Sequence, residues 1–387
     1  MKSLSNLLSL ALATSALALP STPSTLTAAN THTIPLVRRG AATDNLAAAD
    51  GVADLDAVLA HLAFLEAKYA GADQAADVVE KRATGAGSAA LVPSEGGSSW
   101  AVEAGFGSSG TTFPMILDTA SSDCRVAQAA YDPTKSSTAV NTSTPFSFTY
   151  TNGRPTSGTI WRDTLRLAGL SVPSVAVGVS TQTFLSEAAG VCGLAPDGSS
   201  AFNNHFHPFF YQMVSSGAVS QPVFSFALSK NAGTVTFGGT PAGAGAVVSA
   251  PAVNPVNGFW KLTGSVAGVD NDFVLDSSSN LMVVPLDDAG TYFANLGATT
   301  FKKGGALFGS YACAKPPSIV FKFGAASVPV VSSAMSIGKT AAGECILPIV
   351  GKQFGLAIPS VGGPLFESAL VVFDVKANTV GFAQREG

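Results

Sequence analysis

The distribution of apolar and polar positions changes at about residue 99. From there to the C-terminus, short apolar runs alternate with glycine, serine, proline and asparagine. Short apolar runs bounded by turn residues are typical of β-strands. We expect a mostly β protein with strands that include 146–150, 171–179, 223–228, 234–237, 273–275, 319–323 and 369–373. The clearest short helix is predicted at 208–216, ending at Gly217.

The segment before this region has a different pattern. Residues 19–82 are rich in alanine and aspartate, and apolar side chains recur with helical spacing at Leu55, Val58, Leu59, Leu62 and Leu65. This periodicity predicts a helix over 54–69.

The first eighteen residues have the pattern of a secretory signal. Lys2 precedes an apolar stretch over 7–17, and small residues follow at the predicted cleavage point. The next segment ends in the basic pair Lys81-Arg82, followed by small residues. We therefore expect a signal peptide (1–18) and a propeptide (19–82) that is released by proteolysis. A basic pair in an ordinary linker is the alternative.

Composition and charge narrow the choice of partners. The chain has 387 residues, of which 12% are charged, and its net charge of −4 comes without a basic cluster. This argues against nucleic acid or an anionic membrane as a partner. His205 and His207 lack a third ligand cluster, so no metal site is expected. Beyond the signal, no run is long enough to span a bilayer and no lipid-anchor signal ends the chain.

Two segments of the chain match each other, 114–121 and 272–279. In each, an apolar run leads into an aspartate, Asp118 or Asp276, followed by small hydroxyl residues. One copy would be an ordinary turn, but two copies about 158 residues apart (276 − 118) indicate one structural unit used twice. The two aspartates would then meet at its symmetry axis. Two close carboxylates share a proton, which suits general acid–base chemistry.

Further motifs follow in a recognisable order. They include 100–107, 113–126, 146–153, 190–195, 209–226, 233–239, 319–323 and 371–374. Together they resemble the pepsin-like aspartic protease family (peptidase A1) of the secreted fungal type. The resemblance implies a bilobed, mostly β fold with an active-site cleft between two pseudo-symmetric lobes, here an N-terminal lobe (83–229) and a C-terminal lobe (230–387).

The resemblance also implies roles for individual residues. Asp118 and Asp276 match the catalytic aspartates, whose shared proton is an established property of this family. Tyr150 matches the flap tyrosine. Ser121 and Ser279 match the hydroxyls that bond the outer carboxylate oxygens, and Thr119 and Ser277 match the hydroxyls that brace the two lobes.

Four positions around this site depart from the family pattern. Ala120 and Ser278 stand where the family has glycine, Arg125 replaces a tryptophan, and Thr151 replaces the first glycine of the flap. Glycine allows close approach of backbone and substrate, so the added side chains could crowd the site.

The segment before the lobes fits the same resemblance. Residues 34–39 resemble the family's pro-strand, and Lys68-Tyr69 resembles the pair whose lysine neutralises the two aspartates in the zymogen. A solvated lysine at a helix end is the alternative.

The chain has four cysteines and one acceptor sequon in the predicted mature region. Cys313 and Cys345 match the family's disulfide in the C-terminal lobe. Cys124 and Cys192 replace apolar residues on segments that the family places side by side; a bridge is expected in an exported protein, and two buried thiols are the alternative. Asn141, in Asn-Thr-Ser, is a predicted N-glycosylation site.

The resemblance implies a secreted acid endopeptidase that acts on peptides or proteins as a monomer, with a vacuolar location as an alternative destination. It implies no metal or organic cofactor. An alternative function is a catalytically impaired pepsin-like protein that binds peptides or proteins without cleaving them. A structural role at the cell surface ranks third.

Overall fold

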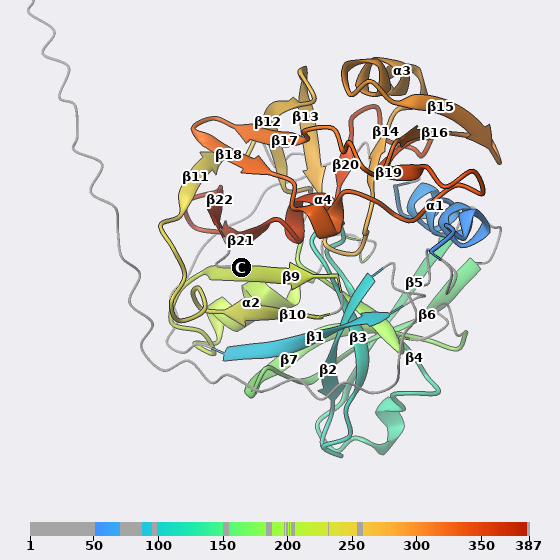
Figure 1. The fold of residues 1–387 in the computed structure, drawn as a ribbon. Coiled ribbons are helices and arrows are strands. Elements are labelled where there is room, and N and C mark those ends of the chain that lie inside the picture. The colour runs from blue at the N-terminus through green and yellow to red at the C-terminus, as the bar shows by residue number, and fades with distance from the viewer. Residues whose placement is uncertain are drawn as a thin grey trace, which may run out of the picture.

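A computed structural model describes residues 51–69, 87–94, 99–149, 155–182, 188–196, 198, 200, 202, 206–230, 232–253 and 258–384. The framework of the protein is formed by two large β-sheets, shown in Figure 1. The predicted signal peptide, the 34–39 segment, the Lys81-Arg82 pair, Tyr150 and Thr151 lie outside the described residues.

The first sheet has thirteen strands among the described residues. Its order is β11-β22-β21-β9-β10-β1-β2-β3-β8-β4-β7-β6-β5. Strand β1 lies between β10 and β2, so it joins the C-terminal strands to those that carry the first aspartate motif. In chain order the bounds are β1 Gly87–Ser94, β2 Ser99–Phe106, β3 Phe113–Asp118, β4 Cys124–Ala127, β5 Val140–Thr149, β6 Pro155–Leu167, β7 Leu170–Ser180, β8 Gly190–Gly193, β9 Val223–Ser229, β10 Ala232–Phe237, β11 Val248–Pro251, β21 Ala369–Asp374 and β22 Thr379–Gln384.

The second sheet carries the other aspartate motif. Its nine strands have the order β15-β16-β19-β14-β20-β13-β12-β17-β18 within the described part of the chain. The bounds are β12 Lys261–Val266, β13 Val269–Leu275, β14 Met282–Val284, β15 Thr299–Lys303, β16 Ala306–Tyr311, β17 Val320–Phe323, β18 Ala326–Pro329, β19 Cys345–Gly351 and β20 Ser360–Val361. The lobe boundary expected at 229/230 falls in the turn between β9 and β10.

The α-helices in the described part of the chain are few. They are α1 Leu55–Tyr69, α2 Phe209–Ser215, α3 Leu286–Asn295 and α4 Gly363–Phe366. Helix α1 begins where the Asp54 carboxylate accepts hydrogen bonds from the backbone N–H groups of Asp56 and Ala57, a standard N-cap arrangement. Helix α2 stops before Gly217, which has φ of 78°. Among the described helices, none is long and apolar enough to cross a bilayer.

These elements confirm the mostly β fold predicted from the pattern. Every run named as an expected strand lies in or overlaps an observed strand, and both expected helices form within one residue of their predicted starts. The reason is physical: strands buried on one or both faces need apolar runs, and each run here ends in residues that favour turns.

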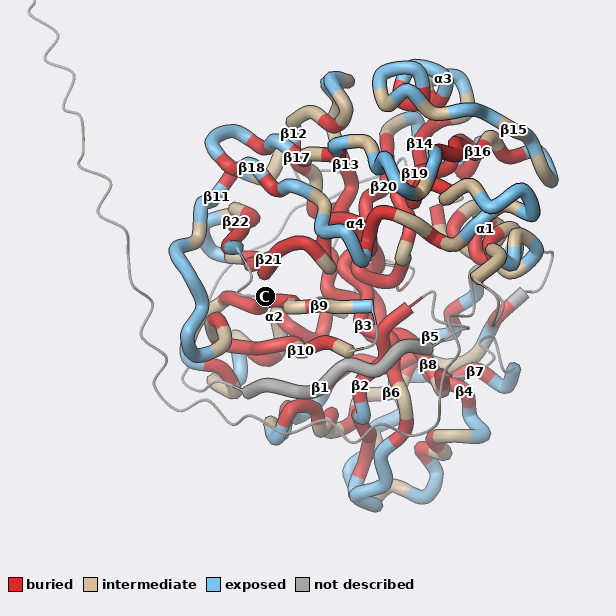
Figure 2. Tube along the Cα trace, in the orientation of Figure 1, coloured by how far each residue is buried: buried red, intermediate tan, exposed pale blue. Residues whose placement is uncertain are grey.

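Helix α1 packs on the second sheet, whose strands come about 200 or more residues later in the sequence. Its apolar face, formed by Val58, Leu62 and Leu65, is fully buried. It contacts a cluster that includes Phe308 of β16 and Ile346 of β19. Figure 1 shows the helix, in blue, beside these strands, and Figure 2 shows buried segments in the interior and exposed segments mostly at the periphery. Each such side chain contributes about 1.5–3 kcal/mol on burial.

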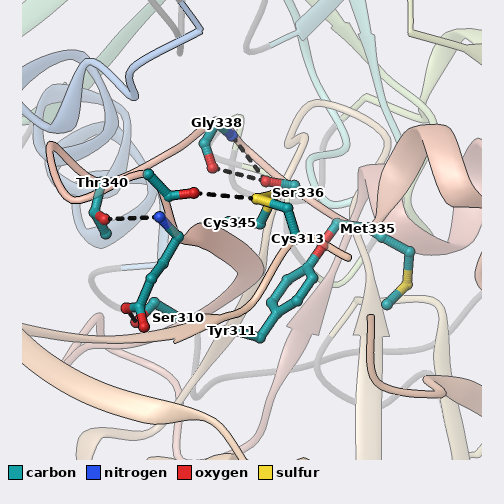
Figure 3. The surroundings of a disulfide bond; sticks show 10 residues. Ser310, Tyr311, Cys313, Met335, Ser336, Gly338, Thr340 and Cys345 are labelled. Atoms are coloured by element: carbon teal, nitrogen blue, oxygen red, sulfur yellow. Dashed lines mark hydrogen bonds between the residues drawn. A yellow bond between two sulfur atoms is a disulfide. The ribbon is translucent and has the colours of Figure 1, made fainter. Parts of the chain in front are cut away.

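Two disulfides are formed. Cys124 of β4 lies directly opposite Cys192 of β8 in the antiparallel pairing, and their sulfur atoms are bonded. Cys313 and Cys345 form the second bridge, whose surroundings are drawn in Figure 3. Near that bridge the Cys313 sulfur contacts the Gly343 carbonyl at 3.4 Å. The thiol alternative for Cys124 and Cys192 does not hold in this structure.

Candidate active site

Asp118 is the last residue of β3 and is 2% exposed. β3 runs parallel to β8, so Asp118 lies opposite Gly193. A Cβ atom at Gly193 would lie 2.2 Å from the Ser121 carbonyl oxygen, a distance that side chains do not reach. Glycine at this position therefore allows the loop after Asp118 to fold back against β8.

Asp276 follows β13 and is fully buried. β13 runs parallel to β20, and the Asp276 N–H donates to the Val361 carbonyl at 2.9 Å. A Cβ at Gly362 would lie 2.0 Å from the Ser279 carbonyl oxygen. Gly362 is thus the counterpart of Gly193, and the sequence pattern alone did not single it out. The two aspartate loops have the same construction, as the repeated motif predicted.

The two loops are joined by reciprocal hydrogen bonds. The Thr119 hydroxyl donates to the Leu275 carbonyl at 2.8 Å and accepts from the Ser277 N–H at 2.9 Å. The Ser277 hydroxyl donates to the Leu117 carbonyl at 2.8 Å and accepts from the Thr119 N–H at 3.0 Å. Each hydroxyl therefore uses its donor and its acceptor on the opposite loop, which fixes the two aspartates relative to each other.

The Lys68 ammonium bridges the two aspartates. Its Nζ atom is 2.7 Å from Oδ1 of Asp118 and 2.7 Å from Oδ1 of Asp276. The lysine side chain is only 6% exposed, so solvent screens these contacts poorly. One positive charge thus lies between two buried carboxyl groups at the C-terminal end of α1.

The neighbouring Tyr69 also belongs to this site. Its hydroxyl donates to Oδ2 of Asp276 at 2.7 Å and lies 3.0 Å from the Ser360 hydroxyl. Burial, together with the nearby Asp276 carboxylate, raises the pKa of Tyr69 well above its ordinary value. The phenol therefore remains a hydrogen-bond donor at all relevant pH values.

Asp276 is stabilised in its ionised form. Burial by itself raises its pKa, but the Lys68 charge, followed by hydrogen bonds from Lys68, Tyr69 and Ser278, holds the pKa below the usual value of aspartate.

Neither serine expected to bond an outer carboxylate oxygen makes that bond while α1 is docked. The Ser279 hydroxyl lies 3.0 Å from Nε2 of His61, a buried residue of α1. Among the described residues, the buried Ser121 hydroxyl has no hydrogen-bond partner. The Tyr69 hydroxyl donates to the outer oxygen of Asp276 (Oδ2), where a bond from Ser279 was expected. A contact from α1 therefore takes the place of one expected within the lobes. The His61 contact was not predicted, because 218 residues separate it from Ser279.

Ala120 and Ser278, which replace the glycines of the two aspartate motifs, both lie at the aspartates. The Ala120 N–H donates to Oδ1 of Asp118 at 2.8 Å, and the Ser278 N–H donates to Oδ1 of Asp276 at 3.0 Å. The Ser278 hydroxyl adds a second donor to the same Asp276 oxygen at 2.8 Å. Both residues are almost fully buried.

This arrangement can perform acid–base chemistry once the ammonium leaves. The inner oxygens (Oδ1) of the two buried carboxyl groups both face the position that Lys68 Nζ occupies. A water molecule at that position would be within reach of both oxygens. Such a pair can accept one proton and donate another in the same reaction.

Comparisons with known proteins agree on one family. Residues 99–385 match the family described as eukaryotic aspartyl protease. Secreted aspartyl protease 1 of Malassezia globosa is 33% identical over 79% of this chain and 78% of its own length. A probable inactive secreted aspartyl protease of the same species is 26% identical over 70% of this chain and 74% of its own.

A solved structure supports the fold independently. The crystal structure of the aspartic proteinase from Irpex lacteus superposes with a TM-score of 0.67 at 21% identity. The match covers 78% of this chain and 98% of that one.

Proposed function

The chain belongs to the eukaryotic aspartyl protease family, and from that premise we propose that it is a secreted endopeptidase that works at acid pH. Asp118 and Asp276 are the catalytic pair in this proposal. Substrates are peptides or proteins, as the family implies, and the mature enzyme acts as a monomer.

One observation carries the proposal: a single atom position is shared by both carboxyl groups. Lys68 Nζ lies 2.7 Å from each inner oxygen, while the two loops are locked by the Thr119 and Ser277 hydroxyls. A water molecule at that position is held by the same two oxygens. Preorganised polar groups around such a nucleophile lower the barrier to attack.

The reaction proceeds by general acid–base catalysis. The ionised carboxylate takes a proton from the water as its oxygen attacks the peptide carbonyl carbon, and the protonated carboxyl gives its proton to the carbonyl oxygen. A tetrahedral diol forms. One carboxyl then gives its proton to the amide nitrogen, and a hydroxyl of the diol gives its proton to the other carboxylate as the carbonyl forms again; the C–N bond breaks and an amine and an acid are released. The pair returns to one shared proton after each turnover.

We also propose that the enzyme is made as a zymogen. Helix α1 supplies Lys68 and Tyr69 to the two aspartates, so water and substrate are excluded while it is docked. The signal-like N-terminus and the similarity to a secreted fungal protease support export. A vacuolar destination is the alternative location.

The test is proteolysis of denatured haemoglobin or casein at acid pH, with and without pepstatin. Asp118→Asn and Asp276→Asn should each lower turnover by at least roughly a thousandfold, because the shared proton needs both acids. Asp270→Asn, an exposed aspartate on β13, is the matched control and should keep full activity. Pepstatin-sensitive turnover in either active-site variant would show that the assignment is wrong.

A second candidate function is binding without cleavage. Ala120 and Ser278 place side chains where the family has glycine, and one relative is named a probable inactive protease. On this hypothesis the wild type binds pepstatin but cleaves nothing, and Ala120→Gly with Ser278→Gly gains activity. Cleavage by the wild type excludes this candidate.

A further inference from the structure

The pseudo-symmetric aspartates do not receive the same hydrogen bonds. On each side a backbone N–H reaches the inner oxygen, from Ala120 to Asp118 and from Ser278 to Asp276. On one side only, a hydroxyl is added: Ser278 Oγ lies 2.8 Å from Oδ1 of Asp276. Alanine at 120 has no equivalent group. The departure from glycine therefore makes the pair asymmetric.

The direction of the Ser278 bond follows from its neighbours. Lys68 Nζ lies 2.8 Å from Ser278 Oγ, and an ammonium group can only donate. The hydroxyl accepts from Lys68 and directs its own proton to Oδ1 of Asp276. The contact is thus a donor to a carboxylate, which is stronger than a hydrogen bond between neutral groups.

The position of Ser278 does not depend on the N-terminal helix, and its hydroxyl still donates to an ionised Asp276 carboxylate, which can only accept. The Ser278 carbonyl accepts from the Ser99 hydroxyl of β2 at 2.6 Å, and the Ser279 carbonyl accepts from the Gly363 N–H at 2.8 Å. Both donors belong to the lobes. When α1 departs, the bonds from Lys68 and Tyr69 to Asp276 leave with it, whereas the two Ser278 donors stay.

We infer that Ser278 is a positioning residue that fixes the negative charge of the pair on Asp276, so that Asp118 carries the shared proton. This inference rests on the proposed function and adds the assignment of roles. A donor to the ionised form stabilises it, and two close carboxyl groups hold one proton between them. Asp276 then takes the proton from water, and Asp118 protonates the carbonyl oxygen.

The first experiment measures kcat/KM against pH for the activated protein, expressed as the full chain. The acid limb reports protonation of the ionised carboxylate. Ser278→Ala removes the donor, so this limb should move to higher pH by roughly one unit. Ser278→Gly is the second variant, in case the alanine protein folds poorly.

A matched swap moves the hydroxyl to the other aspartate. Ala120→Ser combined with Ser278→Ala should return the acid limb close to its wild-type position, because the pair again has one hydroxyl donor. Carboxyl ¹³C NMR at pH 5, assigned with the two Asp→Asn variants, should show Asp276 ionised in the wild type. In the swapped variant, Asp118 should be ionised instead.

The outcomes separate this inference from the proposed function. A wild type that does not cleave protein, whether or not it binds pepstatin, overturns the proposed function, and the NMR titration still decides the charge assignment. An active wild type whose acid limb is unmoved in Ser278→Ala and Ser278→Gly overturns the inference. A uniform loss of rate without a shift of the limb does the same, because it reveals a structural role alone.

Discussion

At the scale of single residues, hydrogen bonds fix the conformation of the glycosylation sequon at Asn141. Asn141 is exposed on β5, and its side-chain oxygen accepts from the Ser143 N–H at 2.8 Å. The Thr142 hydroxyl of the same sequon donates to the Ile160 carbonyl at 2.6 Å. The sequon therefore lies at an exposed irregularity of β5, where its register with β6 shifts, and a glycan can be accommodated at the surface.

At this scale we predict that Asn141 carries an N-linked glycan. Digestion of the secreted protein with an endoglycosidase should lower its apparent mass by about that of one glycan, because Asn141 has the one acceptor sequon predicted in the mature region. Asn141→Gln should abolish the shift, and Asn271→Gln, which lies outside any sequon, should not. An unshifted wild-type band would contradict the prediction.

At the scale of elements, the docking of helix α1 on the second sheet depends on the charge of the aspartates that Lys68 contacts. Its apolar face is buried on the second sheet, and its last turn places Lys68 between the aspartates. The pKa of Asp276 is lowered, so the ionised carboxylate favours the docked helix. This stabilisation is fully present above the ordinary aspartate pKa of about 3.9 and is lost as the pH falls through the lowered value. We therefore expect acid to weaken the docking of the helix.

We predict that Lys68→Met activates the full-length chain at a pH higher by roughly one unit, because the pair loses its counter-charge. The rate of activation against pH is the measurement. Lys303→Met is the matched control: that lysine pairs with Asp56 of α1 at 2.7 Å but is exposed, so its loss should shift the profile little. Equal profiles for Lys68→Met and wild type would mean that the ion pair does not hold the helix.

At the scale of the whole molecule, helix α1 and strand β1 pack against different parts of the fold. β1 already pairs with β10 and β2 while α1 is docked on the second sheet. The disulfide Cys124–Cys192 holds β8, the neighbour of the Asp118 strand, against β4. On the chain-entropy model, closing this loop contributes roughly 3–5 kcal/mol. Helix α1 can therefore leave without a rearrangement of β1.

We predict that maturation cuts after Lys81-Arg82, so that the mature protein begins at Ala83 and keeps β1. Intact mass and N-terminal sequencing of the secreted protein measure this. Changing Lys81 and Arg82 to glutamine should block processing, whereas the same change at Arg38 and Arg39 should leave it unaltered. A mature terminus near residue 40 would show that the boundary was placed wrongly.

The sequence by itself determined the elements and the candidate pair. Apolar runs that end in turn residues specify strands locally, and the repeated run into Asp118 and Asp276 specified two equivalent loops. The helix at 55–69 was equally visible, because its apolar spacing is a local property. The motif order gave the family, and the family implied the pairing of Cys313 with Cys345.

Other contacts at the site were decided only by the tertiary structure. Two contacts show this: His61 lies at Ser279, and Gly362 supports the second loop. No local pattern encodes them, because each depends on the positions of segments brought together by packing. The same packing turned Tyr69 toward Asp276 and left Ser121 without its expected bond among the described residues. Periodicity fixes which face of an element is buried, whereas hydrogen-bond partners follow from the distances that the complete fold sets.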